Sequence, residues 1–308
     1  MIPRGFRQQR GVAVVTAMLL TTLAITIVAS LFWQQQVQVR SIENQRLQLQ
    51  KQWVLRGALD WARLILREDG KYSSIDDLTE PWAVPLSETR LDRYVESAAL
   101  RGESSTAVLS GVIQDAQARL NLSALASHGK VNPSEVAAFE KLLGFLRQDP
   151  GLARAVAQAL AQSQRHGDSG SGSPRMIGFV HVNDLLAVPG ITPFVLTAVR
   201  DHIIFLPRPT TVNANTASAE VLAARVPHWS LADAIKLVTS RRTMSFRGLH
   251  DISARLQDRS ELDPAGLSVS TSYFLVTGRV AIRQAGLEVQ GLVERSGAST
   301  HLLWISQV

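Results

Sequence analysis

The chain begins with a run of apolar positions long enough to cross a membrane. Residues 12–33 carry no charged side chain, no glycine and no proline. As an α-helix rising 1.5 Å per residue, this run covers about 33 Å, against roughly 30 Å for the hydrocarbon core of a bilayer. The pattern therefore predicts a transmembrane helix over residues 12–33.

Beyond the apolar run, polar residues alternate with an apolar stripe that returns every three or four positions. Residues 34–69 contain a single glycine, Gly57, and no proline. The stripe predicts that the same helix continues with one buried face until Asp69 and Gly70 end it. A juxtamembrane coiled coil is the alternative. The stripe consists of Ile42, Leu47, Val54, Ala58, Trp61 and Ile65.

Turn-forming residues separate this helix from the first predicted strand. The segment 71–103 contains Asp76-Asp77 and the sequence EPWAVP at 80–85, whose two prolines favour an extended chain. Period-two alternation then predicts a strand within residues 105–122. Gly111 in this strand is expected to mark a bulge or a close approach of another segment.

The middle of the chain has a helical pattern, and its end has a strand pattern. Helices are expected at 134–148 and 151–165, followed by a Gly/Ser-rich flexible loop at 166–174 and further helices up to residue 256. Thr216 or Ser218, and Ser230, precede acidic residues as N-cap signals. Strands are expected at 268–282, 287–295 and 300–308, joined as an antiparallel meander.

This order of elements predicts an α+β fold in which a long N-terminal helix packs on an antiparallel sheet. A sheet needs several strands and a hydrophobic face to be stable, so the early strand should join the three late ones. The sheet domain is then discontinuous, comprising residues 34–131 and 266–308. An all-helical domain, residues 132–265, is inserted between its strands.

A basic leader precedes the membrane helix. Arg4, Arg7 and Arg10 are followed by Gly11, and the charge stops there. A basic leader, a glycine and then a retained apolar helix are typical of class III, type IV pilin-like signal peptides, so cleavage is expected between Gly11 and Val12. The leader should stay cytoplasmic while the rest is exported. An uncleaved anchor is the alternative.

Composition changes this picture little. The net charge is +6, but three of the positive charges lie in the leader, so the remainder carries only +3. That balance is too weak to indicate a phosphate-rich partner without a clustered patch. The absence of cysteine excludes disulfides, a thiol nucleophile and thiolate metal sites.

Five segments follow one another in a specific order: EPWAVP at 80–85, GVIQDAQARLNLSAL at 111–125, LLAVPGIT at 185–192, VNANTASAEVL at 212–222 and SYFLVTGRV at 272–280. In these segments and in the leader, the chain resembles the type II secretion minor pseudopilin K family, also called general secretion pathway protein K, over nearly its whole length. The resemblance implies a subunit inserted in the inner membrane, with a periplasmic pilin-like fold that holds a large inserted helical domain. It also implies that the subunit forms the pseudopilus tip with minor pseudopilins I and J, initiates assembly and limits fibre length.

The same resemblance points to the residues of processing and assembly. The prepilin peptidase is expected to remove residues 1–11 and to methylate the new amine of Val12. Thr16, the fifth mature residue, replaces the glutamate of most pilin-like proteins, and a tip subunit with nothing above it has no need of that costly carboxylate. Thr16 as an ordinary membrane residue is the alternative. Trp53 and Trp61 are expected to contact the stems of other pseudopilins.

Calcium is bound by some members of the family through acidic loop residues. Hard cations need several converging oxygen ligands, and the corresponding interval here offers only Asp168 as a carboxylate. Calcium is therefore not expected at this place. The other acids, Asp76, Asp77, Asp184 and Asp258, are expected to be solvated surface residues.

The main alternative function is a membrane-anchored DNA receptor. LLAVPGIT and VNANTASAEVL both resemble helix-hairpin-helix elements, whose backbone amides bind DNA phosphates. However, Thr192 replaces the second hairpin glycine, and Arg241 and Arg242 alone do not form a binding groove. The elements are therefore interpreted as a structural scaffold, and no nucleic acid partner is expected.

An enzyme is not expected either. The sequence has no Gly-x-Ser-x-Gly elbow, no His-Glu-x-x-His pair and no phosphate-binding loop. His181 and Asp184 form the kind of pair that starts helices in many domains.

Overall fold

The computed structural model describes residues 10–90, 107–165, 178–256, 266–282 and 285–307. The chain divides into two compact units, Met1–Val54 and Leu55–Val308, which are described separately below. Most of the predicted leader, the Gly/Ser-rich loop at 166–174, Asp168 and Asp258 lie outside the described residues.

The first unit contains the greater part of helix α1, which runs over Arg10–Tyr72. All side chains from Val12 to Trp33 are exposed, including the large apolar ones. By length and composition, α1 contains a segment able to span a membrane. The helix ends two residues after Gly70, close to the predicted end.

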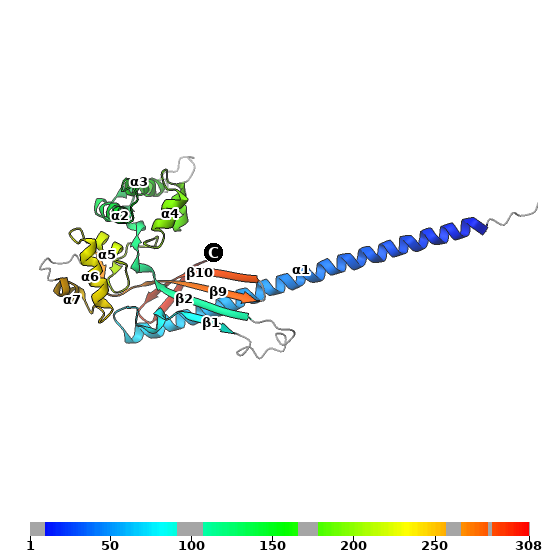
Figure 1. Cartoon of the computed structure of the whole chain (residues 1–308), viewed down its shortest axis with the longest axis horizontal. Helices are drawn as coiled ribbons and strands as arrows, with labels where there is room; N and C mark the ends of the chain where they lie inside the picture. Colours follow the sequence, from blue (N-terminus) through cyan, green and yellow to red (C-terminus); the bar gives the residue numbers. More distant parts are fainter. Residues whose placement is uncertain (1–9, 91–106, 166–177, 257–265, 283–284, 308) are drawn as a thin grey trace, which may run out of the picture. The chain divides into compact units, whose positions relative to one another are not determined.

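The second unit is built on a five-stranded antiparallel sheet with the order β1-β2-β9-β10-β11 (Figure 1). β2 pairs with β9 although the whole helical part of the chain lies between them. This pairing, together with the long helix, confirms the predicted α+β fold class. The strands are β1 Leu86–Arg90, β2 Ala107–Asp115, β9 Tyr273–Ile282, β10 Ala285–Ser296 and β11 Ser299–Gln307.

The C-terminal part of α1 packs on one face of this sheet. Leu59, Ala62 and Leu66 meet Phe274 and Val293 in one buried cluster. The predicted stripe is out of phase by one residue, because Val54, Ala58, Trp61 and Ile65 each precede a more buried neighbour. The predicted residues and the residues that follow them are both apolar, so the local pattern does not distinguish the two sets. Close packing against the sheet determines which set is buried. A Cβ on Gly278 would lie 3.3 Å from Leu55, so this glycine lets the helix approach the sheet.

The opposite face of the sheet is covered by the segments between β2 and β9. Ile204 and Leu206 pack there against Leu275 and Leu292. The strand predicted at 105–122 in fact ends at Asp115, where the chain leaves the sheet through a 3-10 turn, Ala116–Ala118. β1 was not predicted, since its short sequence LSETR lacks an apolar pattern and is held only as a sheet edge.

The described residues between β2 and β9 form six helices around a second hydrophobic core, which includes Phe139, Leu142, Leu222 and Phe246. Because Leu55–Val308 form one compact unit, the division into a sheet domain and an inserted domain stays a prediction. The helices are α2 Pro133–Phe145, α3 Leu152–Arg165, α4 Pro193–Val199, α5 Ala219–Arg225, α6 Leu231–Arg241 and α7 Leu249–Leu256.

Short strand pairs and caps fix these helices. Ser218 and Ser230 are N-caps, as the sequence predicts, whereas Thr216 is not and has another role described below. The paired strands are β3 Leu120–Asn121 with β6 Ile203–Ile204, β4 Ala126–Ser127 with β5 Lys130–Val131, and β7 Val212–Asn213 with β8 Leu267–Ser268. Further 3-10 turns are Pro81–Ala83, Leu122–Leu125 and Val182–Ala187.

Candidate functional site

The predicted processing site lies at the start of α1. Gly11 and Val12 belong to the helix, and Val12 is exposed. Thr16 donates its hydroxyl hydrogen bond within its own helix, with Val12 and Ala13 carbonyl oxygens both at 3.0 Å. A threonine satisfied in this way can lie in lipid without an unpaired polar group. The cleavage and the role of Thr16 stay predictions.

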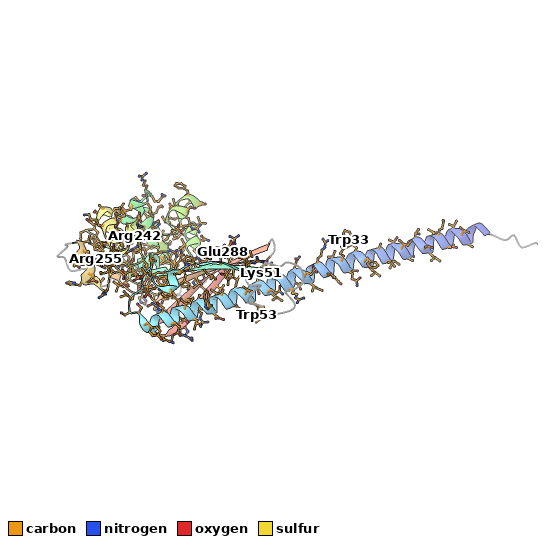
Figure 2. All side chains as sticks on the ribbon, turned by 60° about the horizontal axis from the view of Figure 1, so that its bottom comes forward. Trp33, Lys51, Trp53, Arg242, Arg255 and Glu288 are labelled. Carbon is orange, nitrogen blue, oxygen red and sulfur yellow. The ribbon has the colours of Figure 1, made fainter. Side chains whose placement is uncertain are left out.

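The two tryptophans predicted for assembly are both exposed. Trp53, in the first unit, is 69% exposed and is shown on α1 in Figure 2. Trp61, in the second unit, is 49% exposed. Large exposed apolar side chains on a helix are suited to contacts with another protein. No interface is present in the structure, so their roles stay predictions.

Trp61 borders an apolar cleft of about 340 Å³ between α1 and the β1–β2 edge of the sheet. The segment EPWAVP forms one wall, because Trp82 turns inward and is 1% exposed while Val84 is open to solvent. Sequence reasoning missed this cleft, since its walls come from four separate segments, in α1, 81–86, β2 and β9. Its main apolar lining is Ala58, Trp61, Ile65, Pro81, Val84, Pro85, Leu86, Leu109 and Val112.

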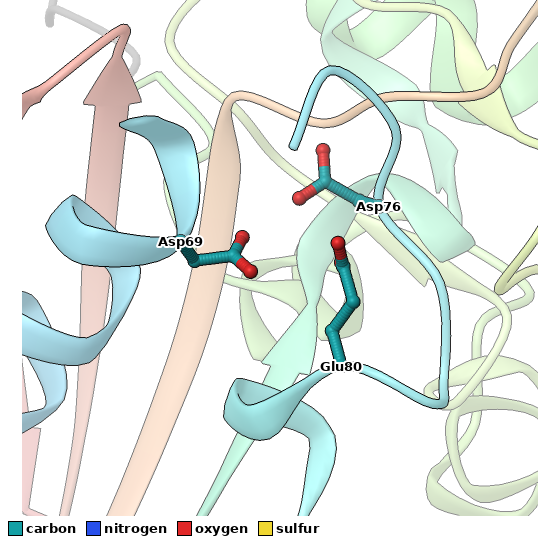
Figure 3. Close-up of side chains that lie close together, drawn as sticks. All are labelled: Asp69, Asp76 and Glu80. Carbon is teal, nitrogen blue, oxygen red and sulfur yellow. The ribbon is translucent and has the colours of Figure 1, made fainter. Parts of the chain in front are cut away.

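Three carboxylates gather where α1 ends (Figure 3). Oxygen atoms of Asp69, Asp76 and Glu80 lie within 4.8 Å of one another. Arg295, at the end of β10, donates to Asp69 Oδ2 at 2.7 Å and to Asp76 Oδ1. The Trp82 indole N–H donates to Glu80 Oε2 at 2.8 Å. The arginine thus provides the cation for two of the three carboxylates, and the group is an ion-pair centre.

Burial dominates the electrostatics of this centre. Burial raises the pKa of Asp69, the charge of Glu80 raises it further, and Arg295 offsets only part of this shift. Burial likewise raises the pKa of Asp76, in spite of the attraction of Arg295. Burial would also raise the pKa of Asp77, but hydrogen bonds from Thr79 outweigh it and lower this pKa.

The sequence-based expectation for two of these acids was wrong. Asp76 and Asp77 are 1% and 7% exposed, rather than solvated. Asp76 can be buried because Arg295 compensates its charge. The two residues are 219 positions apart in the sequence, so no local pattern reveals the pair. Asp184 is half-buried, and its carboxylate accepts from the backbone N–H groups of Val180 and His181 at 2.8 Å, which confirms the expected helix-start pair.

A further buried carboxylate, Asp115, joins three separate parts of the second unit. It accepts hydrogen bonds from the hydroxyls of Thr216 at 2.6 Å and Thr271 at 2.7 Å, and from Asn213 Nδ2 at 2.8 Å. The N–H of Gln117 donates to it at 2.7 Å. Burial raises its pKa, while these donors act in the opposite direction.

Asp115 is connected to the ion-pair centre through Thr271, whose backbone N–H donates to Asp76 Oδ2 at 2.7 Å. Asp69, Asp76, Asp115, Thr271 and Arg295 are together called the polar centre below. It lies where α1, β2, β9 and β10 have their adjoining ends.

Three of the five motifs quoted from the sequence meet at this polar centre. The segment 111–125 supplies Asp115 and Gln117, and the segment 212–222 supplies Asn213 and Thr216. Gln117 Oε1 also accepts from the N–H of Ser272, the first residue of SYFLVTGRV, at 2.7 Å. Hence the motifs share a structural purpose, which is to join the helical segments to the sheet.

Arg241 and Gly190, from the region considered for DNA binding, make internal contacts, whereas Arg242 is exposed. Arg241 donates to the Ala214 carbonyl at 2.6 Å, and burial followed by repulsion from Arg242 lowers its pKa to about 10. The hairpin residue Gly190 has φ +92° and packs on Leu152 of α3. Both features are consistent with the scaffold interpretation.

Comparisons with known proteins agree with this architecture. Two family sequence models, both described as type II secretion system (T2SS), protein K, match residues 118–208 and 212–270. The type II secretion system protein K of Pseudomonas aeruginosa is 26% identical over 300 aligned residues, which cover 90% of this chain and 86% of the relative.

A solved structure has the same fold. One chain in the crystal structure of the GspK-GspI-GspJ complex from enterotoxigenic Escherichia coli matches with a TM-score of 0.65 and 17% sequence identity. The match covers 86% of this chain and 98% of that chain. On the two family models and the relative, this chain belongs to the type II secretion system protein K family.

Proposed function

We propose that this chain is a minor pseudopilin at the tip of a type II secretion pseudopilus, assembled with minor pseudopilins I and J. The observation that carries the proposal is helix α1, apolar and exposed over residues 12–33 and packed on an antiparallel sheet over its last turns. Its fold also matches a chain solved in a GspK-GspI-GspJ complex. The subunit initiates assembly and limits fibre length.

In the proposed cycle, residues 12–33 hold the subunit in the inner membrane before assembly, and the remainder lies in the periplasm. The prepilin peptidase removes residues 1–11 and methylates Val12. Extraction then follows from helix packing against other pseudopilins. Thr16 requires no partner amine, because its hydroxyl is already satisfied by Val12 and Ala13.

The tip position is supported by the elements added to the sheet. A helix and a sheet suffice for a pilin-like subunit, whereas here α2–α7 and their connections are attached between β2 and β9. Such added bulk would block the addition of another subunit above. This block is the proposed basis of length control.

The first test is the mass and N-terminal sequence of the membrane-bound protein, made with and without a prepilin peptidase. We expect a product that begins at methylated Val12 only when the peptidase is present. An intact Met1 in both preparations would contradict the pseudopilin assignment and would favour the anchored DNA receptor.

The second test concerns the partners. Trp61→Glu places a charge on the exposed apolar flank of α1, and we expect it to lower the yield of minor pseudopilins I and J that co-purify with the tagged chain about tenfold. Phe194→Glu on α4 is the matched control, because Phe194 is also exposed, at 76%, and lies on another element. Equal yields for the two variants would remove Trp61 from the interface.

A further inference from the structure

The two edge strands of the five-stranded sheet, β1 and β11, differ in length and in charge. The β1 edge has five residues, carries the charges of Glu88 and Arg90, and has an irregular register between Leu86 and Thr89. Short length, charges and irregular pairing are the usual means by which proteins protect a sheet edge from other strands. The β1 edge is therefore protected.

The β11 edge lacks the first two of these protections, although its pairing with β10 shifts register between Leu292 and Val293. β11 spans nine residues, and the chain from residue 296 to its last residue contains no Asp, Glu, Lys, Arg or Pro. Among the described strands, β11 pairs with β10 alone. Its outer edge therefore presents backbone donors and acceptors on both sides of this irregularity.

The side chains near this edge are apolar as well. Leu303 and Ile305 are 38% and 46% exposed. Arg63 of α1 donates to the Thr300 carbonyl at 3.0 Å, near the beginning of the strand. Trp304 is held by an edge-on contact with the His181 ring, at 4.9 Å between centroids. The strand is thus fixed in place while its later residues stay accessible.

We propose that the edge of β11 accepts an extended, uncharged strand from another minor pseudopilin, which continues the sheet across the subunit boundary. This inference rests on the proposed function, which supplies the partner. Backbone hydrogen bonds provide the affinity in such strand addition, and alternate side chains provide the specificity. Leu303 and Ile305 would contact apolar side chains of the added strand.

Charge complementarity selects the occupant. An uncharged edge can take an uncharged strand without burying an unpaired charge, whereas a charged segment would lose its hydration. A second copy of β11 would also satisfy this condition. A subunit that caps the tip is present once per fibre, however, so the strand comes from one of the other minor pseudopilins.

The absence of cysteine allows a direct test. Ile305→Cys is made in the full-length chain, produced in membranes with the prepilin peptidase and cysteine-free minor pseudopilins I and J. The thiol is labelled with a maleimide-benzophenone and irradiated. The matched control is Ile235→Cys on α6, because this isoleucine has a similar exposure, 51% against 46%.

We expect a covalent adduct of Ile305→Cys with pseudopilin I or J, and none from Ile235→Cys. An adduct of the chain with itself, equal adducts from both positions or no adduct from Ile305→Cys would each overturn the proposal. If the unmodified chain does not co-purify with I and J, the proposed function itself fails, and this result is read before irradiation.

A second arm measures the consequence of blocking the edge. Ile305→Lys adds the type of charge that protects natural edges, and we expect it to lower the co-purified partner about tenfold. Ile235→Lys should leave the yield unchanged. Thermal unfolding of both variants verifies that they fold. A folded Ile305→Lys variant with full partner yield would overturn the proposal.

Discussion

At the scale of single residues, Arg295 is the cation that two buried carboxylates share. It pairs with Asp69 and Asp76, and its guanidinium lies 4.7 Å from the centre of the Phe274 ring. Arg295 is 8% exposed, so no water shell replaces the arginine if it is removed. Two carboxylates then stay buried without a partner.

Replacing Arg295 with methionine should therefore lower the free energy of unfolding by about 3–5 kcal/mol, the usual cost of breaking a buried ion pair from one side. Urea unfolding of the purified chain measures this change. Arg208→Met is the control, because Arg208 pairs with Glu294 while it stays largely exposed, and it should have a much smaller effect. Comparable losses for the two variants would contradict the assigned role of Arg295.

Asp115 predicts a specific pH dependence. Its pKa is raised in the folded protein by burial, so the folded chain takes up a proton at a higher pH than the unfolded chain does. Its ionised form then costs stability, and stability should rise as the pH falls from neutral through the raised pKa toward the ordinary carboxyl range. Asp115→Asn cannot titrate, so its unfolding free energy should depend less on pH in this window.

Urea unfolding of both proteins between about pH 4 and pH 7.5 measures the difference in slope. The amide oxygen of asparagine can keep the place of Oδ1, where it accepts from the Gln117 N–H and the Thr271 hydroxyl. The amide nitrogen then takes the place of Oδ2, where the Thr216 hydroxyl can rotate to accept and Asn213 Nδ2 loses its acceptor. Parallel curves for the two proteins would show that Asp115 has an ordinary pKa.

At the scale of elements, the packing of α1 on the sheet involves two glycines, one with open space around it and one in close contact. Gly57 lies in the helix, is exposed, and has no atom within 4 Å of the place where a Cβ would be. Gly278 lies in β9 under Leu55 of the helix, with only 3.3 Å available. One glycine is free to change, and the other makes close helix–sheet packing possible.

Gly57→Ala should raise the free energy of unfolding by about 0.5–1 kcal/mol, because alanine restricts the unfolded chain and meets no clash. Gly278→Val should lower it by about 1–3 kcal/mol, because its methyl groups would overlap Leu55. Urea unfolding tests both signs. A destabilising Gly57→Ala would mean that the exposed face of this helix is in contact with something else.

The observed helices and strands also show which elements the sequence pattern can predict. The helices α2 and α3 and the strands β9, β10 and β11 begin or end within a few residues of their predicted bounds, because each has a strong local pattern or cap. The phase of α1 was wrong by one residue, since two adjacent apolar rows are equally good locally. β1 was missed because it is stabilised by its pairing with β2, and its own sequence has no strand pattern.

At the scale of the whole molecule, the helical segments and the sheet depend on one another. Ile204 and Leu206 cover the second face of the sheet, and Asn213 and Thr216 donate to Asp115. Deleting residues 132–265 removes all four. The deletion should therefore include Leu275→Thr and Asp115→Asn, which make the exposed sheet face and the polar centre compatible with solvent.

We expect this compensated deletion to insert in the membrane normally and to yield longer pseudopili than the wild-type chain, because the bulk that blocks further addition is gone. Electron microscopy of fibre lengths provides the measurement. The full-length chain with the same two substitutions is the control. Unchanged fibre length in the deletion would contradict the capping role.

The sequence by itself determined the long apolar N-terminal helix, the order of helices and strands, and the family, because these depend on local patterns and on the order of motifs along the chain. It did not reveal the polar centre, in which Asp69, Asp76, Asp115 and Arg295 meet from distant segments. The burial of a charged side chain depends on its partner, and the partner is decided by the path of the chain. Tertiary structure alone decided which face of α1 is buried, where Asp76 lies, and which edge of the sheet is left open.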